Sequence, residues 1–413
     1  MNSFSYIFIA SVVLMAITRI WLARRQINNV DRNKNTVPTA FANDIPLAEH
    51  QKAAAYTVAK TKLSIIVVLY EAAILFALTF GEAINLTYES ISAMELTPIL
   101  EGLVFLGVLS LVLTLIEIPL GLYKTFVLEE KFGFNKMTLG LFVRDTVLGL
   151  VIGAIFGAIL IGIILWLMQT SGPNWWILAW GVAIVFWLFI QFISPTLIAP
   201  LFNKFSPLED EQLKIRIENL LRKCGFASKG LFVMDGSKRS SHGNAYFTGF
   251  GKNKRIVFFD TLIEKHQPEE VEAVLAHELG HFKLKHVTKL TVMMAIFGFI
   301  FFWALGMSQK NPQLFTGINV LHNEVDAVVL ATFYFVVPVF LFFIRPALAS
   351  YLRKNEFEAD AYAASHAPSK DLIKALVRLY KDNSSTLTPD TIYSAFYDSH
   401  PPAGARIRRL QQI

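Results

Sequence analysis

The sequence predicts a mainly α-helical membrane protein with a small α+β unit outside the bilayer. Of its 413 residues, 54% are hydrophobic and only 17% are charged, whereas soluble globular domains carry about 25% charged residues. The apolar residues gather in long uninterrupted runs and not in the periodic stripes of a soluble core. Both observations exclude a large soluble protein, and two long polar blocks between the runs predict the unit outside the membrane.

Seven apolar stretches are long enough to cross the bilayer as helices, because a hydrocarbon core about 30 Å thick needs about 20 helical residues. The first stretch has no Lys or Arg before it and no small-residue cleavage site after it. We therefore expect a retained anchor and not a cleaved signal peptide. The predicted spans are residues 4–22, 63–81, 99–121, 145–168, 176–198, 288–306 and 325–345.

The loops between these spans alternate in positive charge, and cytoplasmic loops are the ones enriched in Lys and Arg. Segment 23–62 carries seven basic residues and loop 122–144 carries four, whereas the intervening loops carry none or a single one. This alternation predicts that the N-terminus lies outside. It also predicts that segments 199–287 and 346–413 lie on the cytoplasmic side.

The net charge of +6 does not indicate a nucleic-acid partner. The basic residues lie mainly in the predicted cytoplasmic loops, where membrane orientation and anionic lipid headgroups explain them. The chain also shows no zinc-finger or RNA-binding signature. The single cysteine, Cys224, excludes an internal disulfide framework and a cysteine-rich metal site.

The predicted spans and polar blocks divide the chain into four parts: residues 1–198 with five spans, a polar segment 199–287, two further spans in 288–345, and a C-terminal polar segment 346–413. Within the first polar segment the patterns predict a helix at 208–224, strands at 230–236, 240–250 and 255–260, and a helix that begins at Pro268. Proline followed by two glutamates is typical of a first helical turn. We expect this last helix to run directly into the sixth span.

The sequence His277-Glu278-Leu279-Gly280-His281 matches the H-E-x-x-H pattern. On a helix, the spacing i, i+4 places both imidazoles on one face, where they can share a cation. Zinc accepts imidazole nitrogen and keeps a position for water in catalytic sites. Glu278 lies beside this face and can take a proton from that water. A helix with two unrelated surface histidines is the simpler alternative.

A third protein ligand is expected on a second predicted helix, around 350–367. Glu356 and Asp360 share one face of it, whereas Glu358 points elsewhere. Glu356 can complete a site of two histidines and one glutamate, and Asp360 can accept an N–H from a ligand histidine. An ordinary solvated acidic helix face explains the same spacing equally well.

The other histidines divide into three groups. His400, followed by two prolines and then Arg406, can donate to a developing oxyanion while Arg406 anchors an acidic group, although a surface turn is an equal alternative. For His286 we expect a structural role. His242 can have either a structural or a functional role. The remaining four are expected to be solvated: His50, His266, His322 and His366.

Six strings in the chain together resemble one family, the type I CAAX prenyl endopeptidases, which are integral-membrane zinc proteases with seven spans. The resemblance covers nearly the whole chain. The strings are EKFGFNKMT (130–138), PTLIAPLFNKFSPL (195–208), GSKRSSHGNAYFTGF (236–250), VLAHELGHFKLKH (274–286), NEFEADAYA (355–363) and SHPPAGARI (399–407).

This resemblance implies a fold and a set of roles. The fold would be a bundle of seven membrane helices that encloses a chamber and carries a small cytoplasmic α+β metalloprotease unit. One Zn²⁺ per chain would be held by the ligands, and peptide bonds would be cleaved by metal-activated water. The implied ligands are His277, His281 and Glu356; the implied catalytic residues are Glu278, His400, Arg406 and Asp360, the last as partner of a ligand histidine; the implied substrate-binding residues are Asn244 and Ala245.

The resemblance leaves the substrate open. The chain ends in RRLQQI and lacks the dilysine-type tail of many eukaryotic members, which favours a bacterial origin and the inner membrane over the endoplasmic reticulum. The substrate is then a peptide or protein, prenylated or otherwise membrane-associated, and one task is quality control of membrane proteins. Two alternatives stay open: a proteolytically idle chaperone or scaffold with structural zinc, and a transporter that uses Glu101, Glu117 and Arg144.

Overall fold

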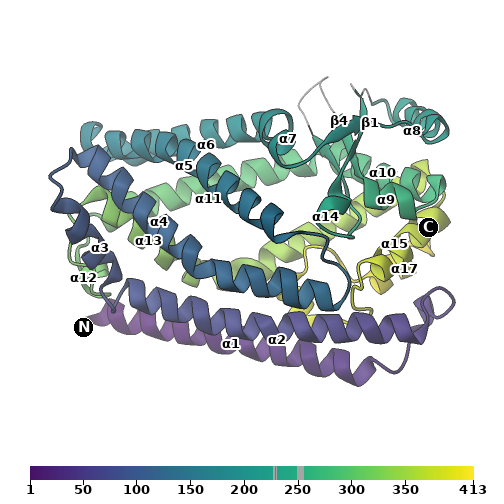
Figure 1. The fold of residues 1–413 in the computed structure, drawn as a ribbon, viewed down its shortest axis with the longest axis horizontal. Helices are drawn as coiled ribbons and strands as arrows, with labels where there is room; N and C mark the ends of the chain where they lie inside the picture. The colour runs from purple at the N-terminus through teal and green to yellow at the C-terminus, as the bar shows by residue number, and fades with distance from the viewer. Residues whose placement is uncertain (227, 229, 249–254) are drawn as a thin grey trace.

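The computed structural model describes residues 1–226, 228, 230–248 and 255–413. Long helices fill one part of the molecule, and a small sheet with shorter helices fills the other (Figure 1). The N-terminus lies at the end formed by the long helices, and the C-terminus lies at the end with the sheet (Figure 1). The mainly α-helical fold predicted from the sequence is therefore confirmed.

Among the described residues, seven helical segments are long and apolar enough to cross a membrane, as predicted. Several extend beyond the apolar stretches, because polar turns continue the same helices outside the hydrocarbon core. They are α1 (Ser3–Asn33), α2 (Leu47–Leu78), α4 (Pro98–Tyr123) with the π-helical turn η2 (Lys124–Glu129), α5 (Leu139–Thr170), α6 (Trp175–Ile193) with the π-helical turn η4 (Ser194–Ile198) and α7 (Ala199–Phe202), α11 (His286–Ser308), and α13 (Asp326–Leu341) followed by α14 (Arg345–His366).

The long helices bury one apolar side against each other and leave the other exposed. Phe105 of α4, Leu165 of α5 and Val328 of α13 lie in one core cluster and are almost fully buried. By contrast, Val151 and Ile155 of α5 are exposed. An exposed apolar stripe along a membrane helix is the surface expected to face lipid. Two short helices, α3 (Ala83–Ser92) and α12 (Gln313–Thr316), lie at the end of the bundle near the N-terminus (Figure 1).

The second region contains a four-stranded sheet in the order β1-β2-β4-β3. Strands β2 and β4 are parallel, while β1 and β3 pair antiparallel with β2 and β4. Three of these strands lie within the predicted ranges, and β1 was not predicted. The strands are β1 (Phe205–Pro207), β2 (Leu231–Met234), β3 (Ala245–Thr248) and β4 (Arg255–Phe259). Gly249 and Phe250, predicted to end the third strand, lie outside the described residues.

Helices from both polar segments pack around this sheet and share one buried cluster, which includes Ile217, Phe258, Leu275 and Leu372. The helices come from distant parts of the chain, so this cluster fixes the two polar segments against each other. They are α8 (Glu211–Lys223), α9 (Asp260–Lys265), α10 (Pro268–Lys283), α15 (Ser369–Asp382) and α17 (Ala403–Leu410). Helix α16 (Thr391–Tyr397) instead contacts α1 and α14.

The helix expected to run from Pro268 into the sixth span is interrupted, and that expectation was wrong. Helix α10 ends at Lys283, and α11 begins at His286. Between them Lys285 adopts a left-handed conformation with φ of 59°, which breaks the hydrogen-bond ladder of a right-handed helix. The break turns the chain beside the H-E-x-x-H segment and places His286 at the start of a new helix.

Helices α10 and α14 pack at very short range, and Gly280 makes this possible. A Cβ atom on Gly280 would lie 3.0 Å from Ala359 Cα and 3.1 Å from Ala359 O. Any larger residue would therefore push the two helix backbones apart. Because α10 carries the H-E-x-x-H segment and α14 carries Glu356, this contact sets the distance between them.

Candidate active site

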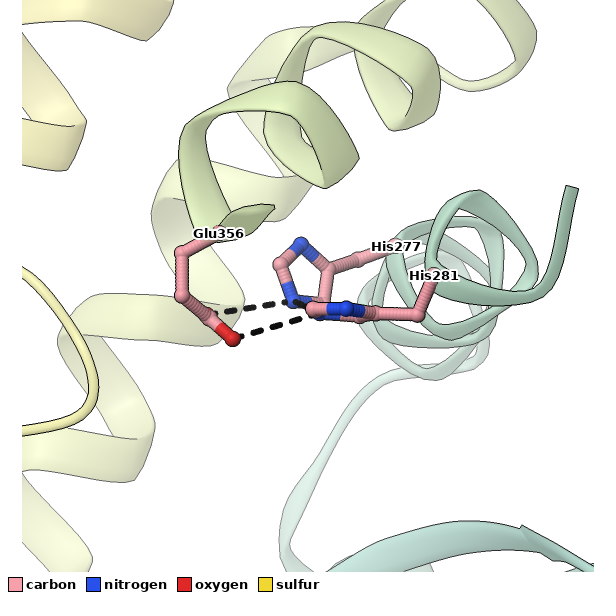
Figure 2. A group of neighbouring side chains, drawn as sticks. All are labelled: His277, His281 and Glu356. Atoms are coloured by element: carbon pink, nitrogen blue, oxygen red, sulfur yellow. Dashed lines mark hydrogen bonds and ion pairs between the residues drawn. The ribbon is translucent and has the colours of Figure 1, made fainter. Parts of the chain in front are cut away.

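Two imidazoles of α10 and one carboxylate of α14 converge on one point (Figure 2). The Nε2 atoms of His277 and His281 are 3.2 Å apart. Glu356 Oε1 lies 3.2 Å from His281 Nε2, and Glu356 Oε2 lies 3.5 Å from His277 Nε2. Ligand atoms about 2.0–2.1 Å from a tetrahedral zinc ion would be about 3.3 Å from each other. The three separations therefore fit a common metal ion.

The far side of each imidazole is also held. His277 Nδ1 lies 2.9 Å from Asp360 Oδ1, so it donates its N–H to this carboxylate. His281 Nδ1 lies 3.1 Å from His286 Nδ1, and His286 Nε2 lies 3.1 Å from Glu358 Oε2. If His286 donates to Glu358, its Nδ1 accepts the N–H of His281. His277 and His281 then direct their Nε2 lone pairs towards the same point as the carboxylate of Glu356.

Three Lewis-basic atoms at this range repel each other unless a cation or proton lies among them. Glu356 Oε2 is buried and accepts no hydrogen bond from the part of the chain that the structure describes. Burial lowers the pKa of His277, but interactions with the carboxylates of Asp360 and Glu356 outweigh it, so the pKa lies above its usual range. The site therefore favours positive charge at this point, which a divalent metal supplies.

Arg406 of α17 lies behind the two carboxylates and is 6% exposed. Its Nε and Nη2 donate to Asp360 at 2.8 and 2.6 Å, and its Nη1 lies 3.5 Å from Glu356 Oε2. The sequence interpretation placed an acidic group against Arg406; the structure identifies this group as Asp360. The guanidinium offsets the charge of two buried carboxylates and fixes both relative to His277.

Glu278 lines a cleft of about 320 Å³, next to the point where His277, His281 and Glu356 converge. His277, Asn244 and Ala245 line the same cleft, so the H-E-x-x-H helix faces the start of strand β3 across it. Strand β3 pairs with β4 on one side only, and no other described strand covers its second edge. The cleft also has an apolar wall, formed by Leu262, Val274, Leu372, Leu376 and Leu379.

His400 stands at the mouth of this cleft. Its Nε2 lies 3.4 Å from Glu356 Oε1, while 63% of its side chain is exposed. Partial burial lowers the pKa of His400 and the nearby Glu356 opposes this, with the net pKa below its usual range. The two C-terminal residues predicted from one string thus take different places: His400 faces the open cleft, and Arg406 is buried beneath it.

Several residues near the site were not identified from the sequence. His242 stacks on Phe134, and its Nδ1 lies 3.0 Å from Asn383 Oδ1. On its other side His242 Nε2 lies 3.8 Å from a carboxylate oxygen of Glu129. These partners come from η2, from the loop after it and from the end of α15. No sequence spacing could relate them, because they meet only in the folded chain.

His286, for which a structural role was expected, lies behind His281, and Glu358, expected to point elsewhere, binds the other nitrogen of His286. Of the four histidines expected to be solvated, two are buried: His50 is 1% exposed and His266 is 6% exposed. The Nε2–H of His50 donates to the carbonyl of Asn33, and the Nδ1–H of His266 donates to the carbonyl of Leu262. One nitrogen of each ring thus bonds to a backbone carbonyl, while the other buried nitrogen has no hydrogen-bond partner among the described residues; the sequence pattern does not reveal this burial.

Comparison with known proteins divides the chain into two matched parts. Residues 26–204 match the family model described as CAAX prenyl protease N-terminal, five membrane helices. Residues 207–413 match the model of peptidase family M48. Together the two models account for almost the whole chain, from the second half of α1 to the last residue.

Relatives match over similar lengths. A CAAX prenyl protease 1 homolog of Arabidopsis thaliana is 35% identical over 407 residues, 97% of this chain and 95% of that protein. CAAX prenyl protease 1 of Saccharomyces cerevisiae is 32% identical over 420 residues, 95% and 92% of the two chains. The crystal structure of S. mikatae Ste24p superimposes with a TM-score of 0.91 at 29% identity and covers 99% of both chains.

Proposed function

Because the chain belongs to the CAAX prenyl protease family, whose C-terminal part is a peptidase of family M48, we propose that it cleaves membrane-associated peptides at one zinc ion held by His277, His281 and Glu356. Family membership itself makes the protein an integral-membrane metalloprotease, as the sequence resemblance implied. The proposal concerns the identity of the metal, the roles of the residues and the class of substrate.

The convergence of three metal-binding side chains beside an open cleft and a free strand edge is the observation that carries this proposal. Zinc, when bound, polarises a water molecule and the scissile carbonyl. Two histidines and one glutamate form a ligand set typical of catalytic zinc, which leaves a fourth position open. The tautomers fixed by Asp360 and by His286 present unprotonated Nε2 atoms to the ion.

Glu278 is the proposed general base. It lines the cleft next to His277 and makes no hydrogen bond or ion pair with the described residues, so its carboxylate is available for water. Glu278 takes a proton from the attacking water and transfers it to the leaving amine. His400, at the cleft mouth, donates a hydrogen bond to the oxygen of the scissile carbonyl as negative charge develops.

Strand β3 is the proposed substrate-binding edge. A peptide that adds to this free edge gains main-chain hydrogen bonds whatever its side chains are. Asn244 and Ala245 stand at the start of the strand and line the cleft. The leucine-rich wall opposite would accept an apolar side chain of the substrate. Asp360 and Arg406 act as positioning residues: Asp360 contacts His277, and Arg406 contacts Asp360 and Glu356 while it also borders the cleft.

The relatives are named CAAX prenyl proteases, and we extend this substrate class to the present chain: a peptide near a membrane surface, prenylated or otherwise membrane-anchored. The seven spans would enclose the site in a chamber. The charge alternation of the loops supports a cytoplasmic site with the N-terminus outside. The membrane is the inner membrane in a bacterium and the endoplasmic reticulum in a eukaryote.

Purified protein should cleave a farnesylated C-terminal peptide in detergent or in vesicles. Glu278→Gln should bind as much zinc as the wild type and reduce kcat at least about 100-fold, the usual contribution of a general base. The unprenylated peptide tests the substrate class: equal kcat/KM for both forms would limit the proposal to membrane peptides in general. Full activity of Glu278→Gln would eliminate Glu278 as the base.

The same variant separates the proposal from the alternative of an idle chaperone. In cells that lack the protein, Glu278→Gln should fail to restore the phenotype if proteolysis is the function. It should restore the phenotype fully if the zinc is only structural. Proteomics of membrane fractions from cells with Glu278→Gln should in addition show accumulation of uncleaved substrates relative to the wild type.

A further inference from the structure

A groove of about 550 Å³ lies between the end of α1, residues 51–66 of α2 and the π-helical turn η2. It shares no lining residue with the active-site cleft. The loop between α1 and α2 lies at the end of the molecule that holds the sheet (Figure 1), so the groove lies on the helical bundle near that end. Short π-helical stretches within long helices are frequently found at functional sites.

One part of the groove is apolar and exposed. Ile66 of α2 is 57% exposed, Val127 of η2 is 50% exposed, and Tyr123 at the end of α4 is 49% exposed. Ala55 and Ala59 line the groove one helical turn apart on α2, and their small side chains leave the space between α2 and η2 open. Lipid tails are as apolar as these side chains, so this part of the groove can hold an acyl chain.

The face of α2 that lines the groove is turned away from the interior of the bundle. Thr57, Lys60 and Ser64 of α2 line the cavity that borders His400, whereas Lys62 and Ile66 line the groove. At 100° per residue these two sets occupy opposite faces of one helix. The groove is therefore open to the surroundings of the bundle and not to its interior.

Three lysines from three elements line the groove: Lys34 at the end of α1, Lys62 of α2 and Lys131 two residues after η2. Asp31 is the one carboxylate among the lining residues, and it pairs with Lys34 at 2.8 Å. Lys62 and Lys131 are exposed and form no ion pair within the part of the chain that the structure describes. Two ammonium groups from distant parts of the chain are therefore available to one anion.

The walls of the groove are fixed, because α2 and η2 pack against each other behind it. Tyr56 of α2 donates to Glu129 of η2 at 2.8 Å, and its ring centroid lies 5.0 Å from that of Phe132. Tyr56 and Leu128 are buried in one cluster. The fold thus holds the element with Lys62 against the element with Lys131, and a ligand between them has a site formed in advance.

The apolar and basic parts of the groove follow the membrane boundary expected from the sequence. Ile66 lies within the predicted span 63–81, whereas Lys34 and Lys62 belong to the basic segment 23–62, which is expected on the cytoplasmic side. The cytoplasmic leaflet is rich in anionic lipids, and basic pockets between membrane helices on that side bind lipid headgroups.

We propose that this groove binds one anionic phospholipid, with the phosphate at Lys62 and Lys131 and an acyl chain along Ala59, Ile66 and Val127. The inference goes beyond the peptidase function and does not rest on it, because the groove and the active-site cleft have separate linings. A zwitterionic headgroup adds a positive charge next to two lysines, so it should bind more weakly than an anionic one.

Native mass spectrometry of the full chain, purified in detergent with equal amounts of phosphatidylglycerol and phosphatidylcholine, measures the preference. Each lysine near an anionic headgroup usually contributes about fivefold in affinity. The wild type should therefore retain phosphatidylglycerol at least about tenfold more than phosphatidylcholine. The double variant Lys62→Gln with Lys131→Gln should lose about 25-fold in affinity for phosphatidylglycerol, with little change for phosphatidylcholine.

Lys124→Gln is the matched control, because Lys124 is an exposed lysine of η2 that does not line the groove. It removes the same charge and should leave both affinities unchanged. Ala55→Trp tests the apolar part: it keeps every lysine but fills the groove, and it should weaken phosphatidylglycerol binding at least about tenfold. Thermal unfolding before lipid is added identifies folded variants. If the double variant is not folded, Lys62→Gln alone decides, with an expected loss of about fivefold.

Equal retention of the two lipids by the wild type would overturn the inference, as would wild-type affinity in the double variant. Glycerol phosphate or a polyglutamate peptide that displaced the lipid at equal concentration would also overturn it, because charge alone would then explain binding. Glu278→Gln should bind phosphatidylglycerol like the wild type. A chain without peptidase activity that still selects this lipid would therefore refute the proposed function and leave the lipid site intact.

Discussion

The Nδ1 atom of His286 lies 3.1 Å from the Nδ1 atom of His281. His286 is 4% exposed and begins helix α11, directly after the break that ends α10. Glu358 holds its other nitrogen at 3.1 Å. The turn between the two helices therefore places the buried His286 behind His281, a proposed zinc ligand, and connects His281 to a carboxylate on α14.

His286→Phe should weaken zinc binding about 10- to 100-fold, because partners behind a ligand histidine usually contribute that much affinity. The ring volume is nearly kept, so a loss of affinity would report the lost hydrogen bonds. Competition with a zinc-binding dye measures the effect. His322→Phe is the control, since His322 pairs with Glu89 elsewhere. Equal affinities of His286→Phe and wild type would show that His281 needs no such support.

Asp360→Asn should lower both stability and zinc affinity. The change removes a charge that pairs with Arg406 inside the protein, and breaking a buried pair typically costs about 3–5 kcal/mol. The amide oxygen can still accept the N–H of His277, so zinc binding should be reduced and not abolished. Thermal unfolding in detergent and zinc titration measure the two effects separately. Wild-type stability of the variant would indicate that water screens this pair.

Gly280→Ala should destabilise the protein by about 1–3 kcal/mol, the usual cost of overpacking. Alanine favours a helix by about 1 kcal/mol over glycine, but the added Cβ meets backbone atoms of Ala359, which cannot rotate away. Gly149→Ala is the control, because nothing lies within 4 Å of its Cβ position. It should be neutral or slightly stabilising, and equal effects of both changes would contradict the close packing of α10 and α14.

Chelation should inactivate the protein reversibly. Prolonged dialysis against a chelator should remove activity, and about one equivalent of Zn²⁺ per chain should restore it. Glu356→Gln should not regain activity at the same zinc concentration, because a neutral amide is a weaker ligand than a carboxylate. Full activity of the metal-free wild type, or restoration of Glu356→Gln at one equivalent, would contradict the assignment.

Much of the fold followed from the sequence because membrane helices impose a strong pattern. Seven spans were predicted from apolar length, and all seven have a counterpart in the structure. Their ends were less predictable: α2 begins at Leu47, well before the apolar stretch from residue 63, because its first turns pack beside the end of α1, where His50 bonds to the carbonyl of Asn33. Strand β1 has three residues, too few for a periodic pattern.

The active site also contains some features that the sequence predicts and others that it does not. His277 and His281 are spaced i, i+4, and so are Glu356 and Asp360, so each pair could be predicted from the spacing along its helix. The contacts between the helices could not be predicted from the sequence. Arg406 lies against Asp360 and His286 lies against Glu358, and both contacts arise through tertiary packing. The left-handed Lys285, which sets the position of His286, carries no sequence signal such as glycine.

Anomalous diffraction from crystals of the purified protein, recorded on both sides of the zinc absorption edge, tests the central claim most directly. We expect one zinc peak, about 2.0–2.2 Å from His277 Nε2, His281 Nε2 and an oxygen of Glu356. A peak at another group of side chains, or the absence of any zinc signal in protein that cleaves peptides, would contradict the account.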